Sequence, residues 1–215
     1  MQISVCAHPL LDATVVQIEV DGAIGAVATS SALEHALAPN AVAPWARPPN
    51  LALDVRGLLR HGGYKPSGRG KPASEYLATA HAAGTFPRIN ALVDAANATS
   101  LHSGLPISLL DAAALRGATR IEILAPDSTY VFNPSGQTID ASGLLAFCDE
   151  AGAAGTPVKD AQRTKTHAGS TALLAVIWGT NLHRGYTAQT AAYLCELLAS
   201  FKTGLHWRAA ALVVA

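Results

Sequence analysis

The segment between Ile89 and Leu101 constrains the fold most, because it has helical periodicity but contains no Lys, Arg or Glu. The pattern predicts a helix over residues 87–101 whose core face consists of Ile89, Leu92, Val93 and Ala96. A helix at the surface of a soluble protein usually carries charged residues on the side that faces water. This segment lacks such a face, so we expect neighbouring elements to cover the helix on most sides.

Three polar side chains, Asn90, Asp94 and Asn97, form a second stripe beside the core face. In a helix that is covered on most sides, each of them is costly to bury unless it finds a hydrogen-bond partner. The residues alone leave two interpretations open. The three side chains either satisfy a buried structural network or face a pocket and contact a ligand.

A turn with further polar groups follows the helix. Gly104 is suited to end the helix, Pro106 forces an extended exit, and Asp111 is placed to cap a short turn over 112–116. His102 is a candidate proton acceptor, although a lone histidine at a helix end is more often a capping or surface group. Ser108 lacks a G-x-S-x-G elbow and an evident His/Asp order, which disfavours a covalent serine enzyme.

The rest of the chain mixes helices and strands without steady β-α-β alternation, which predicts an α+β fold with mixed β-sheets packed against helices. Helices are expected over 30–38, 73–83 and 185–201, and strands over 15–20, 120–124, 129–132, 144–148, 172–178 and 206–214. The pair at 21–22 predicts the start of a hairpin, and residues 56–72 are expected to form an irregular loop. We expect most of the sheet to come from the second half of a single domain over residues 1–215.

Composition limits the classes of function. The 15 basic residues balance the 15 acidic ones, so no net field draws the chain to nucleic acid or anionic lipid, and any RNA contact must be local. Without a leader pattern or a run of about 18 apolar residues, we expect neither export nor membrane insertion. Three well-separated cysteines and the absence of a metal-binding histidine spacing predict a reducing, cytoplasmic setting with no metal and no cofactor. The oligomeric state cannot be predicted from these features.

One local concentration of basic residues lies between Arg56 and Lys71. Its glycines allow close approach of a ligand, and its cations suit phosphates, but a solvated surface loop explains the same residues equally well. The stretch from Gly63 to Gly70 imitates a nucleotide-hydrolysing phosphate loop only superficially, because Arg69 and Gly70 replace the required lysine and hydroxyl residue. Nucleotide hydrolysis is therefore not expected.

Several residues follow one another in a recognisable order: Arg69, Glu75, Pro87-Arg-Ile-Asn90, Leu92-Val-Asp94, Asn97, Ser100-Leu101, Gly104, Pro106 and Asp111. This order resembles the B3/B4 editing module of the phenylalanyl-tRNA synthetase beta chain, and more closely the free-standing proteins of that family. The resemblance covers roughly residues 54–178, continues less tightly from Arg120 to Thr171, and implies a B3/B4-like domain. Ala96 and Ser108 stand where the family has threonine and histidine, and the strand that carries a tyrosine-reading acid ends here as Val176-Ile177-Trp178.

The resemblance implies that the chain hydrolyses a misacylated tRNA or a related aminoacyl ester, with water as the nucleophile. The candidate catalytic residues are Asn97, Ser108 and His102. The candidate substrate-binding residues are Asn90, Asp94, Gly104, Arg69, Lys71, Arg163 and Lys165. The last four are assigned to the terminal phosphates, and backbone amides near Gly104 to the developing oxyanion. Nothing resembles an aminoacylation domain, so a complete phenylalanine-tRNA ligase is not expected.

The alternative is a noncatalytic module that binds tRNA or an amino-acid-like small molecule. The zero net charge and the replacements at Ala96 and Ser108 favour it. A purely structural domain is a third interpretation, in which the polar stripe is a buried network. The sequence does not determine which amino acid or tRNA is recognised.

Overall fold

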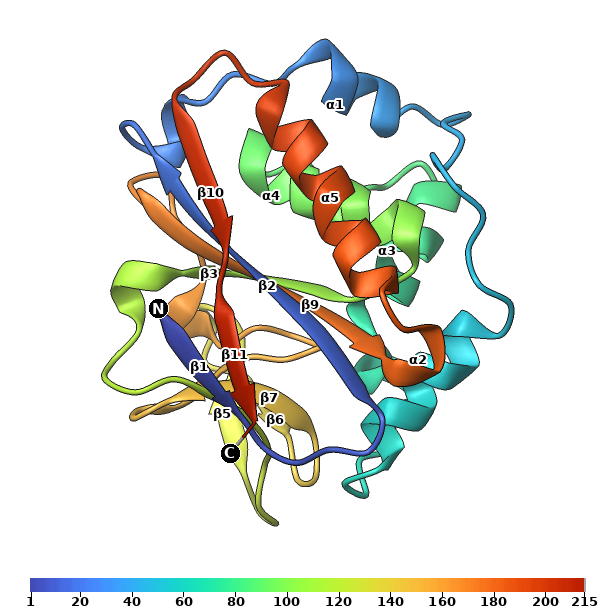
Figure 1. The fold of residues 1–215 in the computed structure, drawn as a ribbon, viewed down its shortest axis with the longest axis vertical. Coiled ribbons are helices and arrows are strands. Elements are labelled where there is room, and N and C mark those ends of the chain that lie inside the picture. Colours follow the sequence, from blue (N-terminus) through green and yellow to red (C-terminus); the bar gives the residue numbers. More distant parts are fainter. Residues whose placement is uncertain (215) are drawn as a thin grey trace.

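The computed structural model describes residues 1–214, and these form the expected α+β fold, built around a central four-stranded sheet (Figure 1). The sheet is antiparallel throughout, with its strands in the order β10 (Leu205–Ala209), β2 (Leu11–Val20), β9 (Ala172–Thr180) and β3 (Ile107–Asp111). Helices cover one face of this sheet, and a second sheet packs against the other face.

The second sheet has five strands, in the order β11 (Ala211–Val214), β1 (Gln2–Val5), β4 (Arg120–Ile123), β7 (Leu145–Asp149) and β8 (Gly152–Gly155). Strand β1 runs parallel to both of its neighbours, β11 and β4. Because β11 is one of these neighbours, the first and last described strands lie side by side (Figure 1). A separate hairpin consists of β5 (Thr129–Val131) and β6 (Thr138–Asp140). The hairpin matters for function because it forms one wall of the cavities described below.

Strand β9 shows why the central sheet is buried on both faces. Leu173, Ala175 and Ile177 point into the cluster shared with the helices, whereas Leu174, Val176 and Trp178 point into the cluster between the sheets. Alternation along a strand sends successive side chains to opposite faces, so a continuous apolar run fits a strand with cover on both sides.

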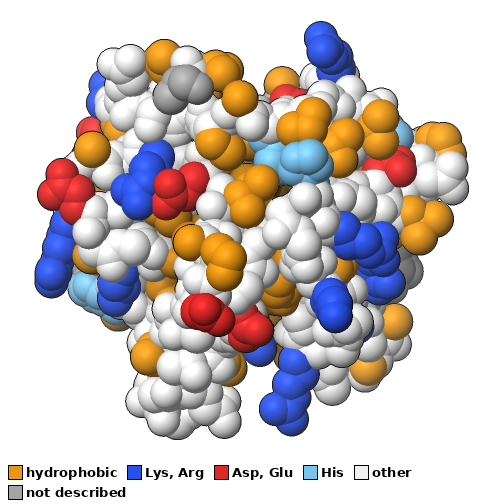
Figure 2. Space-filling model, turned by 90° about the horizontal axis from the view of Figure 1, so that it is seen from below, with side chains coloured by type: hydrophobic (Ala, Val, Ile, Leu, Met, Phe, Trp, Pro, Cys, Tyr) orange, Lys and Arg blue, Asp and Glu red, His pale blue; other side chains and the backbone are white. Residues whose placement is uncertain are grey.

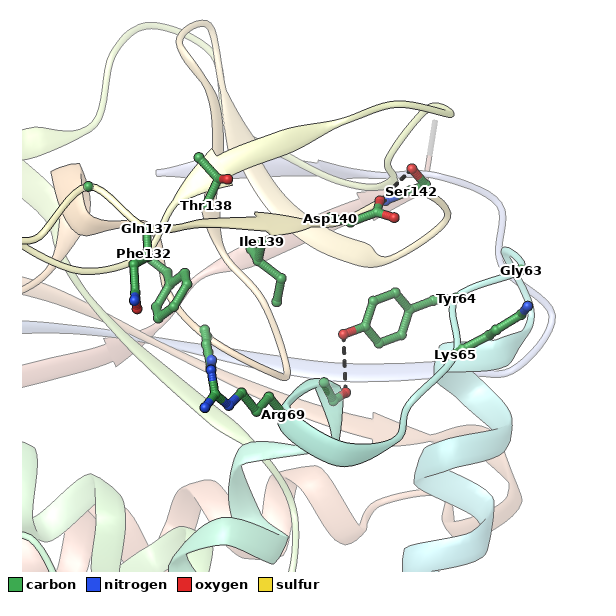
Figure 3. A pocket seen from close by; sticks show the side chains of 13 residues that line it. Gly63, Tyr64, Lys65, Arg69, Phe132, Gln137, Thr138, Ile139, Asp140 and Ser142 are labelled. Atoms are coloured by element: carbon green, nitrogen blue, oxygen red, sulfur yellow. Dashed lines mark hydrogen bonds between the residues drawn. The ribbon is translucent and has the colours of Figure 1, made fainter.

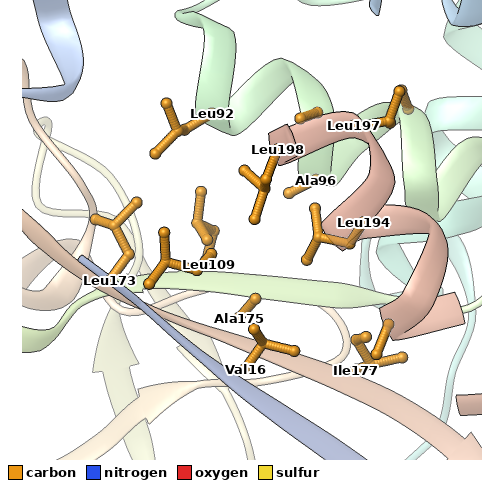
Figure 4. Packing of buried hydrophobic residues seen from close by; sticks show 14 of the residues in the cluster. Val16, Leu92, Ala96, Leu109, Leu173, Ala175, Ile177, Leu194, Leu197 and Leu198 are labelled. Carbon is orange, nitrogen blue, oxygen red and sulfur yellow. The ribbon is translucent and has the colours of Figure 1, made fainter. Parts of the chain in front are cut away.

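The helices are α1 (Ser31–Ala36), α2 (Leu51–Arg60), α3 (Ala73–Ala82), α4 (Ala91–Ser103) and α5 (Tyr186–Ala199). Helix α4 contacts α1, α3, α5 and β3, and all its residues except Val93 and Asn97 are buried. Figure 4 shows Leu92 and Ala96 of α4 meeting Leu194 and Leu198 of α5 above the sheet. The expectation that the uncharged helix is covered on most sides is confirmed.

The start of α4 was predicted wrongly. The helix begins at Ala91, because the Asn90 side chain accepts a hydrogen bond from the Val93 backbone N–H and caps it. Ile89 consequently lies outside the helix and is 66% exposed, so it does not belong to the core face.

Other boundaries also differ from the sequence-based predictions. Helix α2 occupies residues 51–60, where part of an irregular loop was expected. No hairpin follows Val20, since β2 pairs with the distant β9 and β10. The predicted last strand is two strands in different sheets. Only β1 and β2 come from the first half of the chain, so the expectation that the second half supplies most of the sheet is confirmed. Within residues 1–214 no helix is long and apolar enough to cross a membrane.

Candidate functional site

A cavity of ≈ 500 Å³ lies between the N-terminus of α3, the end of the β5–β6 hairpin and the segment that follows β8. We call it the basic cavity, because four cationic side chains line it: Arg69, Lys71, Lys159 and Lys165. Its other lining side chains include Tyr76, Phe132, Asn133, Val158 and the single acid Asp160. The cavity thus combines cations, an apolar wall and one carboxyl group.

The cations come from segments that are distant in sequence. Lys159 Nζ lies 4.0 Å from the centre of the Phe132 ring, and Lys165 Nζ donates to the Phe132 carbonyl oxygen at 2.6 Å. Burial and the nearby positive charges of Arg69 and Lys165 lower the pKa of Lys159. An incoming anion would relieve this mutual repulsion.

Positive charge is concentrated at this site and does not form a uniform field. The face of the molecule in Figure 2 carries scattered Lys and Arg side chains among apolar and uncharged surface. This distribution agrees with the zero net charge of the chain.

Asp160 is the one acid in the basic cavity and is only partly exposed. Burial raises the pKa of its carboxyl to about 6, although the nearby Ser108 hydroxyl and the Thr156 and Leu109 backbone amides favour the ionised form. Lys165 acts in the same direction at longer range. At neutral pH the carboxyl is therefore mostly ionised but poorly solvated.

Ser108 lies behind Asp160 and is completely buried. Its hydroxyl lies 3.1 Å from the Thr156 carbonyl oxygen, to which it donates, and it accepts a hydrogen bond from Trp178 Nε1 at 3.0 Å. The alternation of β3 explains this position, because Ser108 and Leu110 point between the two sheets. Ser108 supports the floor of the cavity and does not itself line it.

A second hollow of ≈ 810 Å³ adjoins the basic cavity and shares Arg69, Phe132 and Lys159 with it. We call it the hairpin groove. Figure 3 shows the β5–β6 hairpin, with Ile139 and Asp140, on one side and the loop that carries Lys65 and Arg69 on the other. The Tyr64 hydroxyl donates to the Gly70 carbonyl oxygen at 3.1 Å and closes this loop (Figure 3).

The structure brings together three of the predicted phosphate-binding residues, Arg69, Lys71 and Lys165. It does not bring Arg163 to them. The Arg163 guanidinium makes a bidentate ion pair with Asp149, at 2.7 and 2.9 Å, and also donates to the Gly152 carbonyl oxygen. Arg163 therefore holds the β7–β8 turn.

The polar stripe of α4 lies outside both hollows. Asn90 is the helix cap, and the buried Asp94 carboxylate accepts hydrogen bonds from Arg88 Nε and the Ile89 backbone N–H, both at 2.8 Å. Asn97 is half-buried and lines neither hollow. For Asn90 and Asp94 the structure thus agrees with the interpretation in which the polar side chains satisfy a structural hydrogen-bond network.

His102 and Gly104 also lie away from the basic cavity. His102 is buried, and its Nε2 lies 2.7 Å from the Ala36 carbonyl oxygen, which can only accept, so this nitrogen carries a proton. Burial lowers the pKa of His102 and keeps the ring neutral. Gly104 takes φ +78 at the C-terminus of α4, where Arg47 donates to the last carbonyl groups. Gly104 therefore ends α4, and His102 links α4 to the last residue of α1.

The roles of Lys159, Asp160 and Phe132 were not predicted from the sequence. A signal was present, because Lys159 and Asp160 directly precede the stretch that supplied Lys165. Phe132 had no such signal, since only the fold brings the hairpin against that stretch. Among residues 1–214 no group of three or more His, Cys, Asp or Glu side chains is arranged to hold a metal ion.

Comparison with known proteins gives a fold-level relationship. No protein-family model matches the sequence, and no curated protein matches it either. The chain is an α+β protein whose fold is similar to that of a solved N-terminal fragment of the phenylalanyl-tRNA synthetase beta-subunit from Pyrococcus horikoshii. The TM-score is 0.59 at 7% identity, and the match covers 99% of this chain and 52% of that fragment.

The chain thus spans about half the length of the fragment that it resembles. At this level of identity the likeness concerns the fold alone. The predicted resemblance to the synthetase beta chain is supported to that extent, and the narrower assignment to its B3/B4 module stays a prediction.

Proposed function

We propose that this protein binds the end of a tRNA, with terminal phosphates in the basic cavity. The observation that carries the proposal is the convergence of Arg69 with Lys159 and Lys165, from two segments distant in the sequence, on one cavity. Guanidinium and ammonium groups are the usual partners of phosphate oxygens, and contacts of this kind position a nucleic acid without reading its sequence. The fold-level likeness to a synthetase fragment makes tRNA the nucleic acid to test first.

Salt dependence of tRNA binding tests this proposal. Each phosphate contact with single-stranded RNA adds about 0.7 to the slope of log K against log salt, so Lys71→Gln and Lys165→Gln should each lower the slope by about that amount. Lys202→Gln is the matched control, because Lys202 is exposed between α5 and β10, far from the cavity. The proposal fails if the two cavity variants bind tRNA as the Lys202 variant does.

Hydrolysis of an aminoacyl ester is the finer part of the proposal. Clustered cations stabilise an oxyanion as it develops, and Lys159 and Lys165 are placed to do so for an ester in the cavity. Since Ser108 and His102 do not reach the cavity, water is the nucleophile in this scheme. The chemistry therefore depends on electrostatic stabilisation and not on a protein nucleophile.

A panel of charged tRNAs distinguishes two locations for such a reaction. In the basic cavity, Lys159→Gln should slow release of the amino acid about 10- to 100-fold, and Asn97→Ala should leave it unchanged. The opposite pattern would place the reaction at α4. If the wild-type protein releases no amino acid faster than buffer does, the hydrolytic part of the proposal is refuted.

A small amino-acid-like ligand is the second candidate. A volume of ≈ 500 Å³ with an apolar wall and a few polar groups lies within the usual range of small-molecule sites. Titration calorimetry with free amino acids, in parallel with tRNA at low salt, separates the two. Binding of a free amino acid without any binding of tRNA would favour this candidate.

A further inference from the structure

Among residues 1–214, Asp160 has no cation partner, unlike several other acids that are buried or partly buried. Asp94 is paired with Arg88, Asp149 is paired with Arg163, and Asp54 contacts His183. Within the part of the chain that the structure describes, no Lys, Arg or His nitrogen lies within 4.0 Å of the Asp160 carboxylate. The lack of an ion pair is notable because Asp160 shares its cavity with four cations.

The neighbouring cations are directed elsewhere. Lys165 donates to the Phe132 carbonyl oxygen, and Lys159 lies over the face of the Phe132 ring. The Asp160 carboxylate accepts a hydrogen bond from the Thr156 backbone N–H, which lies 3.2 Å from Oδ1. The cavity therefore contains a carboxylate, that of Asp160, which can accept further hydrogen bonds. The cationic side chains of the cavity lie apart from it.

We propose that Asp160 binds the ammonium group of a ligand whose anionic part lies on Arg69, Lys159 and Lys165. The ligand class is an α-amino-acyl or amino-acid-like compound, with its side chain against the apolar wall. This inference rests on the proposed function and specifies which part of an aminoacylated RNA end enters the cavity. The ammonium group of such a ligand would form the ion pair that Asp160 lacks within the described part of the protein.

The separation of charges gives the site its selectivity. A simple phosphate would satisfy the cations but would leave Asp160 unpaired beside an added negative charge. A simple amine would satisfy Asp160 but would add to the repulsion among the cations. Only a ligand that carries both charges, held apart by its own covalent framework, neutralises both regions.

Two matched probes test the assignment by titration calorimetry with the full chain. The first is a 3′-aminoacylamino-adenosine 5′-monophosphate, whose amide link resists hydrolysis and whose α-ammonium is free. The second is the same compound with hydrogen in place of the α-amino group. A charge-assisted hydrogen bond at this site predicts at least tenfold tighter binding of the first probe to the wild-type protein.

Asp160→Asn should remove this preference without weakening the second probe, because the amide keeps an acceptor oxygen and nearly the same volume and no longer repels an anion. Glu196→Gln is the matched control. It removes one negative charge from an exposed position on α5 and should keep the full preference.

Each outcome decides the assignment. Equal wild-type affinity for the two probes refutes it, and so does an Asp160→Asn variant that weakens both probes alike. If tRNA binds with a cavity-dependent salt slope and the probes show no preference, the ammonium site is wrong and the phosphate site stands. If the preference appears but tRNA does not bind, the Asp160 assignment stands and the tRNA proposal is wrong.

Discussion

Replacing Asp160 with Asn should stabilise the folded protein at neutral pH. Burial raises the pKa of this carboxyl from its ordinary value of 3.8 to about 6, so the folded state binds the proton more tightly than the unfolded chain does. Linkage then requires that wild-type stability rises as the pH falls through about 6 towards 4. Above that range the ionised carboxylate is a net cost, and Asn removes it.

The size of the effect follows from the pKa shift. Two pKa units correspond to about 3 kcal/mol at about 1.4 kcal/mol per unit, which is an upper limit because Asp160 is partly exposed. We expect Asp160→Asn to raise the free energy of unfolding by about 1–2 kcal/mol at pH 7.5, or the melting temperature by about 2–8 °C for a chain of this size. The gain should vanish near pH 4.

Urea unfolding of wild-type and variant proteins at pH 7.5, 6.0 and 4.5 measures this difference. Other groups also titrate in this range, but they contribute equally to both proteins and cancel. The reasoning is refuted if the variant is less stable at pH 7.5, or if the difference does not change with pH. Asp94→Asn provides the contrast: its carboxylate bonds to Arg88 and the Ile89 backbone N–H, so its loss should destabilise by about 1–3 kcal/mol.

Three further substitutions test the fold by thermal unfolding. Gly143→Ala should destabilise the protein by at least about 3 kcal/mol, because the residue has φ +70 and a Cβ would lie 2.0 Å from the Gly62 carbonyl oxygen. Gly22→Ala is the control: Gly22 has φ +100 but open space around it, so the cost should stay near 1 kcal/mol. Asn90→Ala removes the cap of α4 and should cost about 1 kcal/mol, whereas Asn90→Asp should cost little. Trp178→Phe deletes the indole donor to the buried serine of β3 and should cost about 1–3 kcal/mol.

The sequence was sufficient to predict the fold class and most elements where local signals and burial agree. The apolar run of β9 and the helical period of α5 each produced the predicted element, because burial and local propensity favour the same structure there. Prediction failed where long-range pairing decides. Residues 206–214 have one strand-like pattern, but the chain crosses from one sheet to the other at Ala210.

The site was predicted only in part for a related reason. Arg69, Lys71 and Lys165 were chosen for their chemistry, and chemistry can be read from single residues. Arg163 was chosen on the same grounds but pairs with Asp149, and no local pattern announces an ion pair between a loop and a strand end. Because its guanidinium is paired with Asp149, Arg163 is not available to bind a phosphate in the cavity.

The polar residues of α4 and the cations of the basic cavity perform different work. Asn90 and Asp94 make hydrogen bonds to their own helix start, so the motif behind the family resemblance supports the position of α4 in the core. The charged groups of the cavity lie on loops, where hydration keeps them available to a ligand. Substitutions of Asn90 and Asp94 in and before α4 should therefore lower stability and leave ligand affinity per folded molecule unchanged. Lys71→Gln should instead lower ligand affinity and leave stability unchanged. If the α4 variants and the cavity variants all lost both stability and ligand affinity, the α4 network and the cavity would act as one site.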